Sequence, residues 1–136
     1  MVELRLLDTD TVSYYFRHDA VVQTHVRRYL NEHDALTISC ITYYEVLRGL
    51  LARNSTRQLR DFDRFISHNH VVPLDKQALG AAAEIYAQLQ KQGTLINEGD
   101  MLIAGTAVAL NAVLVTNNTA HFSRIPQLKI ENWRLP

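Results

Sequence analysis

The sequence predicts an α/β domain in which a mainly parallel sheet lies between two layers of helices. Short aliphatic runs typical of buried strands recur along the chain, and helix-length segments with apolar residues at helical spacing separate them. No repeat, low-complexity tract or Pro/Gly-rich linker interrupts this alternation. We therefore expect a single three-layer α/β/α domain over residues 1–136.

The first third of the chain contains two predicted strands and two predicted helices. The aliphatic run of residues 4–7 predicts a buried strand that ends at Asp8. A short helix over residues 10–17 comes next, and apolar residues at helical spacing predict a longer helix over residues 20–33. Alternating leucine and isoleucine in residues 35–39 indicate the second strand.

The middle of the chain is predicted to be mostly helical. A threonine opens a helix over residues 42–52, and a second helix follows over residues 56–68. A short strand at residues 71–72 precedes a proline. An alanine-rich helix then covers residues 75–92, and it ends there because Gly93 suits the left-handed conformation of a helix C-terminus.

The last third of the chain is predicted to complete the core. Residues 100–110 are almost wholly apolar, so we expect a buried helix, followed by a core strand at 113–116 and an edge strand at 128–130. In open parallel sheets, sites collect beyond the carboxyl ends of the strands, where the topology switches direction. Asp8 and Thr116 end two of the strands, so we expect the site near them.

Bulk composition narrows the class of protein. With 47% apolar residues, the 136-residue chain can form a real core. No apolar stretch approaches the roughly 20 residues that span a bilayer, and nothing at the start resembles a signal peptide. The single cysteine, Cys40, agrees with a reducing compartment. We therefore expect a cytoplasmic protein with no membrane partner.

Charge gives only local support for nucleic-acid binding. The net charge is zero, which argues against a general electrostatic attraction to a polyanion. Five arginines nevertheless lie close together in the sequence: Arg48, Arg53, Arg57, Arg60 and Arg64. A solvated helix face explains such a run equally well, so these arginines permit phosphate contact and establish nothing more.

Two aspartates stand where chemistry is expected. Asp8 ends a buried strand, where a carboxylate is costly unless it is paired or binds a cation. Asp10 is better explained as the N-cap of the next helix. Asp100 opens an apolar helix whose N-terminus points toward the same sheet edge as Asp8. Two carboxylates brought together there repel each other, and a divalent cation is the usual remedy.

Glu45 leaves two interpretations open. The segment from Thr42 to Glu45 matches the S/T-x-x-E capping box, so helix capping alone would explain the glutamate. The alternative is that Glu45 joins Asp8 and Asp100 in binding a metal. One carboxylate cannot fully serve a backbone amide and a metal at the same time.

Four motifs in register along the chain resemble one family. They comprise residues 6–10 (LLDTD), 44–49 (YEVLRG), 100–107 (DMLIAGTA) and 115–122 (VTNNTAHF). Their order and spacing, the chain length and the tail from Ile125 to Trp133 are similar to PIN domains. More narrowly, they resemble the VapC toxins of prokaryotic toxin–antitoxin pairs.

This resemblance implies a PIN-like fold and a sequence-selective endoribonuclease that uses Mg²⁺ or Mn²⁺ and inhibits translation by cleaving RNA such as tRNA or rRNA. It also implies a cognate antitoxin that holds the enzyme inactive. The metal-binding and catalytic acids of the family map onto Asp8, Glu45 and Asp100. Aromatic clusters at residues 14–16 and 43–44 that are not used in the core offer a face for a homodimer or for the antitoxin.

The chain departs from the family pattern at the fourth acid. Family members often carry an acid at the position of Asn118 or a few residues further on, near His121. The amide oxygen of Asn118 can ligate a metal or hold a water, so we include it among the catalytic residues, but it brings no charge. Asp10, Glu98 and His121 stay open as substitutes for the missing acid, and the number of metal ions stays open with them.

Two other functions are considered. A catalytically silent PIN-like protein that binds RNA or acts as a scaffold would share this pattern, and adding metal to a mixture with RNA discriminates it from a nuclease. A small-molecule α/β enzyme, such as a phosphatase or a nucleotide binder, is the second alternative. A nucleotide cofactor is disfavoured, because neither GxxxxGK[ST] nor GxGxxG follows any predicted strand. Single-nucleotide phosphoesterase activity without RNA cleavage would favour the phosphatase.

Overall fold

Five short strands form one parallel sheet in the computed structural model, which describes residues 3–136. They are β1 (Arg5–Leu7), β2 (Thr37–Ser39), β3 (His70–Val72), β4 (Val113–Val115) and β5 (Lys129–Glu131). The strand order is β3-β2-β1-β4-β5, and every neighbouring pair is parallel. All five predicted strands are confirmed, and the sheet is wholly parallel.

Six of the seven helices described between residues 3 and 136 are the predicted ones. They are α1 (Thr9–Phe16), α2 (Ala20–Leu30), α3 (Cys40–Ala52), α4 (Thr56–His68), α5 (Lys76–Gln92) and α6 (Glu98–Ala109). The seventh, α7 (Thr119–Phe122), is a single turn, too short to show a helical period in the sequence. No helix in this part of the chain is both long and apolar enough to cross a membrane.

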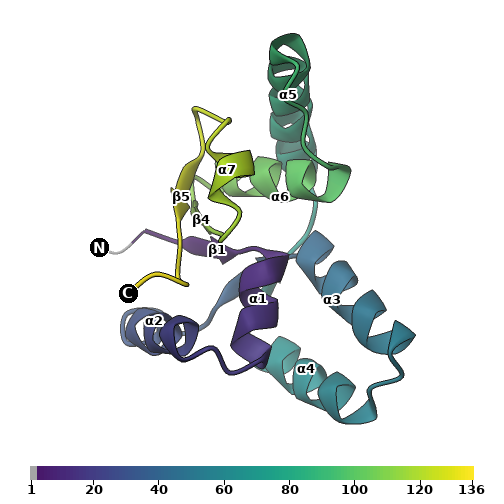
Figure 1. Cartoon of the computed structure of the whole chain (residues 1–136), viewed down its shortest axis with the longest axis vertical. Coiled ribbons are helices and arrows are strands. Elements are labelled where there is room, and N and C mark those ends of the chain that lie inside the picture. The colour runs from purple at the N-terminus through teal and green to yellow at the C-terminus, as the bar shows by residue number, and fades with distance from the viewer. Residues whose placement is uncertain (1–2) are drawn as a thin grey trace.

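Helices cover both faces of the sheet and produce the predicted three layers (Figure 1). Side chains alternate along β1, so that Leu6 packs with α5 and α6, whereas Leu7 packs with α1, α2 and α4. Leu114 and Val115 repeat this alternation on β4. All four side chains are fully buried, which explains why these strands are unbroken apolar runs in the sequence.

The backbones of α5 and α6 cross closely at Gly105, which has no side chain. A Cβ atom at this position would lie 2.7 Å from the carbonyl oxygen of Ala78 and 2.7 Å from the Cβ atom of Ala82. A larger residue would therefore push the two helices apart. The close crossing fixes the direction of α6 and hence the place of Asp100 near its N-terminus.

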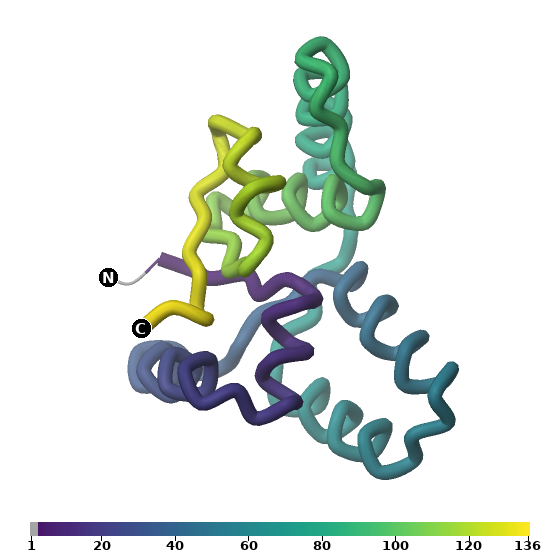
Figure 2. The backbone as a smooth tube through the Cα atoms, viewed as in Figure 1, coloured from purple at the N-terminus to yellow at the C-terminus, as the bar shows by residue number. Residues whose placement is uncertain are grey.

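The topology switches direction beside β1. The chain adds β2 and β3 on one side of β1, and β4 and β5 on the other. The backbone amide of Asp8 donates to the carbonyl oxygen of Val115 at 3.0 Å, which extends the pairing of β1 and β4 past their ends. The chain then passes through β5 and returns to the side of the molecule where β1 begins (Figure 2). The segments that follow β1 and β4 thus lie side by side, where α/β proteins place their sites.

Candidate active site

Asp8 is a buried carboxylate at the carboxyl end of β1. It is the N-cap of α1, because its Oδ1 atom accepts a hydrogen bond of 2.8 Å from the backbone amide of Thr11. Its exposed fraction is only 4%. Burial raises the pKa of Asp8 to about 6, against hydrogen bonds from Thr116 and Thr11 that favour the carboxylate. A charge at this position is therefore costly without a cation.

Asp10 does not cap α1, so that prediction is wrong. Asp8 takes the capping role because the helix begins at Thr9, one residue earlier than predicted. Asp10 lies in the first helical turn with an exposed side chain, and it lines the same pocket as Asp8.

The capping-box explanation of Glu45 is also wrong. Helix α3 begins at Cys40, and its cap is Ser39, whose Oγ atom accepts from the amide of Thr42 at 3.1 Å. Thr42 thus lies inside the first turn, and Glu45 is a turn further along, free of any capping role. Its Oε1 atom instead accepts a hydrogen bond of 2.6 Å from the hydroxyl of Thr9.

Asp100 is the third residue of α6 rather than its first. The helix is capped by Asn97, whose Oδ1 atom accepts from the amide of Asp100 at 2.9 Å. The Nδ2 atom of Asn97 in turn donates to Oδ2 of Asp100 at 2.9 Å. Burial, followed by the negative charges of Glu45 and Asp10, raises the pKa of Asp100 above its usual value.

Glu45 is held between the chain segments that carry the two aspartates. Thr9, its hydrogen-bond donor, directly follows Asp8. On its other side is Gly99, which directly precedes Asp100: a Cβ atom at position 99 would lie 2.6 Å from Oε2 of Glu45. Three acids that are distant in sequence therefore converge at one sheet edge.

The convergence forms an open pocket of about 330 Å³. Its lining residues come from α1, α3, α6, the caps that precede α1 and α6, and the segment between β4 and α7: Asp8, Thr9, Asp10, Glu45, Arg48, Asn97, Asp100 and Asn118. The guanidinium of Arg48 is 4.0 Å from Oε2 of Glu45, but 60% of the Arg48 side chain is exposed. The lining is thus rich in carboxylates, and its arginine stands at the rim.

The structure sorts the candidates for the missing fourth acid. Asn118 lines the pocket, and its Nδ2 atom is 2.8 Å from Nδ1 of His121. His121 is near enough to oppose the raised pKa of Asp100, yet it does not line the pocket. Glu98 does not line it either, whereas Asp10 does. Of these three candidates, Asp10 is therefore the one that lines the pocket.

The donor set fits a hard divalent cation. Carboxylate and amide oxygens are the ligands that Mg²⁺ and Mn²⁺ prefer, and the buried charge of Asp8 requires a counter-charge. Between residues 3 and 136, no three Asp, Glu, His or Cys side chains are set at the spacing of a metal-binding group. The fit therefore rests on the kind of ligand atoms that line the pocket and on the burial of Asp8.

Sequence reasoning missed three residues of this site. Thr9 stands in a motif that the sequence analysis singled out, but its hydroxyl had no assigned role. Asn97 was visible as an N-cap residue type three positions before Asp100. No signal in the sequence marks Gly99, because its contact with Glu45 joins two helices that are distant along the chain.

Comparison with known proteins assigns the family. The PIN-domain family model matches residues 5–128, and the chain belongs to this family of nucleases, which are generally metal-dependent. Within the family it groups with the VapC ribonuclease toxins of toxin–antitoxin pairs, so it is an endoribonuclease of that type.

Two curated relatives support this assignment over nearly the whole chain. The chain is 35% identical to the tRNA(fMet)-specific endonuclease VapC of Salmonella typhimurium, with 94% of this chain and 96% of the relative covered. It is 30% identical to ribonuclease VapC2 of Rickettsia felis, with the same coverage.

Solved structures agree with the sequence comparison. A crystal structure of VapBC2 from Rickettsia felis bound to a DNA fragment from their promoter contains a chain with a TM-score of 0.86 and 30% identity, covering 96% of this chain and 98% of that one. A structure of DNA-bound VapBC from Salmonella typhimurium gives a TM-score of 0.84 and 34% identity, with 97% and 99% covered.

Proposed function

We propose that this ribonuclease cleaves a tRNA with Mg²⁺ or Mn²⁺ held by Asp8, Glu45 and Asp100. The observation that carries the proposal is the buried Asp8 carboxylate, which shares a pocket with the carboxylates of Asp10, Glu45 and Asp100. A tRNA is proposed as the substrate because a relative with 35% identity is named a tRNA(fMet)-specific endonuclease.

Each residue has a distinct role in this proposal. Asp8, Glu45 and Asp100 supply carboxylate oxygens, directly or through water. A metal held by these residues would supply a water of lowered pKa as the nucleophile and would offset negative charge on the scissile phosphate. Asn118 orients a water or a phosphate oxygen through its amide, and Thr116 supports it by accepting a hydrogen bond of 2.9 Å from the Asn118 backbone amide.

The RNA backbone approaches from the side of α3 in our proposal. Arg48 stands at the rim of the pocket, with its guanidinium 5.1 Å from the ring centroid of Tyr44. A neighbouring groove between α1, α3 and α4 is lined by Arg17, Arg53 and Arg57, among others. Although the net charge of the chain is zero, arginines gathered in this region can neutralise backbone phosphates near the site.

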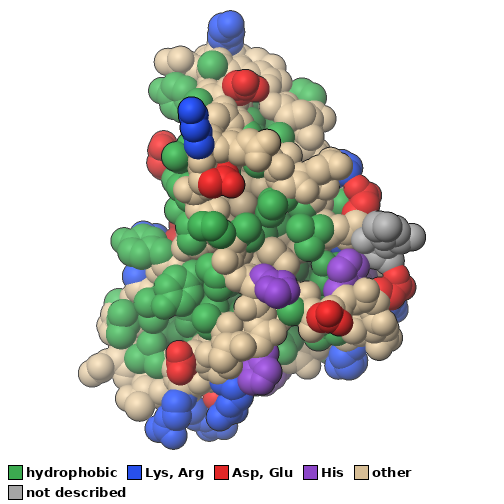
Figure 3. All heavy atoms as spheres, turned by 180° about the vertical axis from the view of Figure 1, so that it is seen from behind, with side chains coloured by type: hydrophobic (Ala, Val, Ile, Leu, Met, Phe, Trp, Pro, Cys, Tyr) green, Lys and Arg blue, Asp and Glu red, His purple; other side chains and the backbone are tan. Residues whose placement is uncertain are grey.

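A cognate antitoxin and a homodimer are the protein partners that we propose. Exposed apolar side chains favour such contacts, including Tyr44 and Leu51 on α3, which are 56% and 58% exposed. Hydrophobic side chains also gather on the face opposite to Figure 1, over the half of the molecule that carries α1–α4 (Figure 3). We place the protein in the cytoplasm, where its proposed RNA substrate is found.

Mg²⁺-dependent cleavage of tRNA by matched variants tests the proposal. Asp8→Ala and Asp100→Ala should each abolish cleavage and leave the fold intact. Asp75→Ala is the control, because Asp75 caps α5 as Asp8 caps α1 but does not line the pocket. Unchanged cleavage by the two pocket variants would contradict the proposed site. Metal-independent cleavage, or RNA binding by the wild type without any cleavage, would contradict the proposed reaction.

A further inference from the structure

We propose that Thr9 and Gly99 are positioning residues that together set the orientation of the Glu45 carboxylate. This inference rests on the proposed function, because it concerns the same pocket. Neither residue carries a charge, and neither is assigned as a metal ligand. Their importance comes from where they touch Glu45: the hydroxyl of Thr9 holds Oε1, and the bare backbone of Gly99 leaves room for Oε2.

The hydrogen bond from Thr9 is the last link of a chain of hydroxyl groups. An ionised carboxylate only accepts hydrogen bonds, so Thr9 must give its single hydroxyl proton to Glu45 at 2.6 Å. The hydroxyl of Thr42, 3.0 Å from that of Thr9, must then donate to Thr9. The hydroxyl of Ser39 donates in turn to Thr42 at 3.4 Å.

This chain of donors ties Glu45 to rigid structure. Thr42 and Ser39 have exposed fractions of only 0% and 1%, and they lie at the junction of β2 and α3. Because every donor points the same way, each polarises the next, and the last one faces the carboxylate. Oε1 of Glu45 is therefore fixed relative to the sheet and to the residue that follows Asp8.

Gly99 limits the carboxylate from the opposite side. A Cβ atom at position 99 would come within 2.6 Å of Oε2 of Glu45, which is closer than real contacts allow. The nearest other atom, Oδ1 of Asn97, would be at 3.5 Å, an ordinary contact. An alanine at this position would therefore displace the flexible end of Glu45 and leave the backbone of α6 undisturbed.

The two positioning contacts link all three acids. Asp8 is the cap of α1, and Thr9 is the first residue of that helix. Gly99 and Asp100 are neighbours in α6. A glutamate placed against both segments keeps a fixed distance to each aspartate. This arrangement orients the Glu45 carboxylate relative to both aspartates, as residues that support metal ligands do.

Thr9→Val tests the hydroxyl, because valine keeps the shape of threonine and removes the donor. We expect kcat for tRNA cleavage and the affinity for Mn²⁺ alone, measured by calorimetry without RNA, each to fall about tenfold. Thr9→Ser should restore both. Thr24→Val is the control, since the Thr24 hydroxyl bonds only within the α2 region. Wild-type Mn²⁺ affinity in Thr9→Val would overturn the role of the hydroxyl, and so would a Thr9→Ser variant as weak as Thr9→Val.

Gly99→Ala separates positioning from stability. Alanine is the better helix former, so a purely structural role predicts a melting temperature that is unchanged or higher and full activity. We expect the melting temperature of Gly99→Ala to be unchanged or higher, but kcat and Mn²⁺ affinity each to fall about tenfold. Gly80→Ala, on α5 where a Cβ would meet nothing within 4 Å, should keep both at wild-type values. Full Mn²⁺ affinity in Gly99→Ala would overturn the role of Gly99.

The failure of this inference can be told apart from the failure of the proposed function. If Asp8→Ala keeps full cleavage, the pocket is not the active site, and the proposed function fails. If Asp8→Ala abolishes cleavage while Thr9→Val and Gly99→Ala bind Mn²⁺ and cleave as the wild type does, only the positioning of Glu45 is refuted.

Discussion

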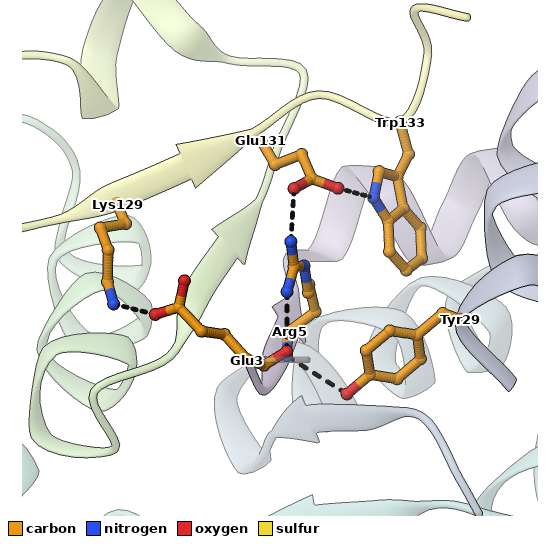
Figure 4. Close-up of polar contacts among 6 residues, drawn as sticks. All are labelled: Glu3, Arg5, Tyr29, Lys129, Glu131 and Trp133. Carbon is orange, nitrogen blue, oxygen red and sulfur yellow. Dashed lines mark hydrogen bonds and ion pairs between the residues drawn. The ribbon is translucent and has the colours of Figure 1, made fainter. Parts of the chain in front are cut away.

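Partly or fully buried carboxylates occur both in the acid pocket and in the polar network beside β5, but their pKa values are shifted in opposite directions. In the network, Glu131 accepts hydrogen bonds from Arg5 at 2.9 Å and from Trp133 at 2.6 Å, and Lys129 pairs with Glu3 (Figure 4). Burial alone would raise the pKa of Glu131, but the bonds from Trp133 and Arg5 outweigh it and bring this pKa below its usual value. This carboxylate helps to hold the edge strand in place.

In the pocket, the hydrogen bonds to Asp8 and Asp100 do not outweigh the effect of burial. Burial raises the pKa of Asp8 to about 6, and the pKa of Asp100 is raised by burial and by neighbouring negative charges. Folding would favour neutral groups at these positions. Carboxylates that lower the stability of a protein are typically found at functional sites. The pocket fits this description, whereas the carboxylate of Glu131 in the β5 network contributes to the fold.

The largest expected effect is a gain of stability when the charge of Asp8 is removed. The pKa of Asp8 is about 6 in the folded protein and 3.8 in the unfolded chain, so its ionisation lowers stability as pH rises from 3.8 to about 6, and the full cost is present above that. Asp8→Asn keeps the N-cap and should raise the free energy of unfolding of the metal-free protein at pH 8 by up to about 3 kcal/mol. Urea unfolding measures it.

Asp19→Asn is the matched control for this gain. Asp19 caps α2, but hydrogen bonds from that helix N-terminus and the charge of Arg134 lower its pKa, so the same substitution should lower stability. A stability loss in Asp8→Asn as well would mean that the pocket does not differ from the rest of the molecule.

The next largest effect is stabilisation by metal, with a defined pH dependence. At pH 8 and a concentration 100 times its Kd, Mn²⁺ should stabilise the wild type by about 2.7 kcal/mol. At pH 5 Asp8 is mostly protonated, so the affinity for Mn²⁺ should fall about tenfold. At the same Mn²⁺ concentration, the stabilisation should then be about half of its value at pH 8. Unfolding at both pH values, with and without Mn²⁺, measures the difference. Equal stabilisation at the two pH values would argue that Asp8 does not bind the ion.

The network beside β5 should respond in the opposite direction to the pocket. Glu131→Gln weakens the pairing with Arg5 and should lower the free energy of unfolding by about 1 kcal/mol, a value reduced by the partial exposure of both groups. Because the folded-state pKa of Glu131 is lowered, its contribution is present above the unfolded pKa and is lost as pH falls. A Glu131→Gln variant as stable as the wild type at pH 8 would show that the network contributes nothing.

The smallest effect is expected at the rim of the pocket. Arg48→Ala should raise KM for tRNA two- to fivefold, roughly 0.5–1 kcal/mol, and reduce the slope of log affinity against log salt by about 1. Stability should hardly change, because the Arg48 side chain is 60% exposed. An unchanged salt slope would remove Arg48 from the RNA path.

Local patterns were sufficient to predict the fold and to single out acids that prove to line one pocket. The buried strands are visible as apolar runs because both faces of the sheet are covered, and Asp8 and Asp100 stand at ends of elements where a charge is conspicuous. The cap assignments failed because capping motifs overlap: Asp8 and Ser39 compete with Asp10 and Thr42 for the same helix starts.

Other features depend on contacts between distant parts of the chain. The orientation of Glu45 is set by Thr9 and Gly99, which lie 36 residues before it and 54 residues after it. The ion pair of Arg5 with Glu131 joins the two ends of the chain. Such pairings follow from the strand order, which short-range periodicity does not determine.

Anomalous diffraction from crystals soaked in Mn²⁺ tests most directly whether the acid pocket is a metal-binding active site. We predict a peak within coordination distance of Asp8, Glu45 and Asp100, which should be lost in crystals of Asp8→Asn. Mn²⁺ bound only elsewhere, or a pocket without a peak at saturating Mn²⁺, would contradict the claim that the pocket is a metal-binding active site.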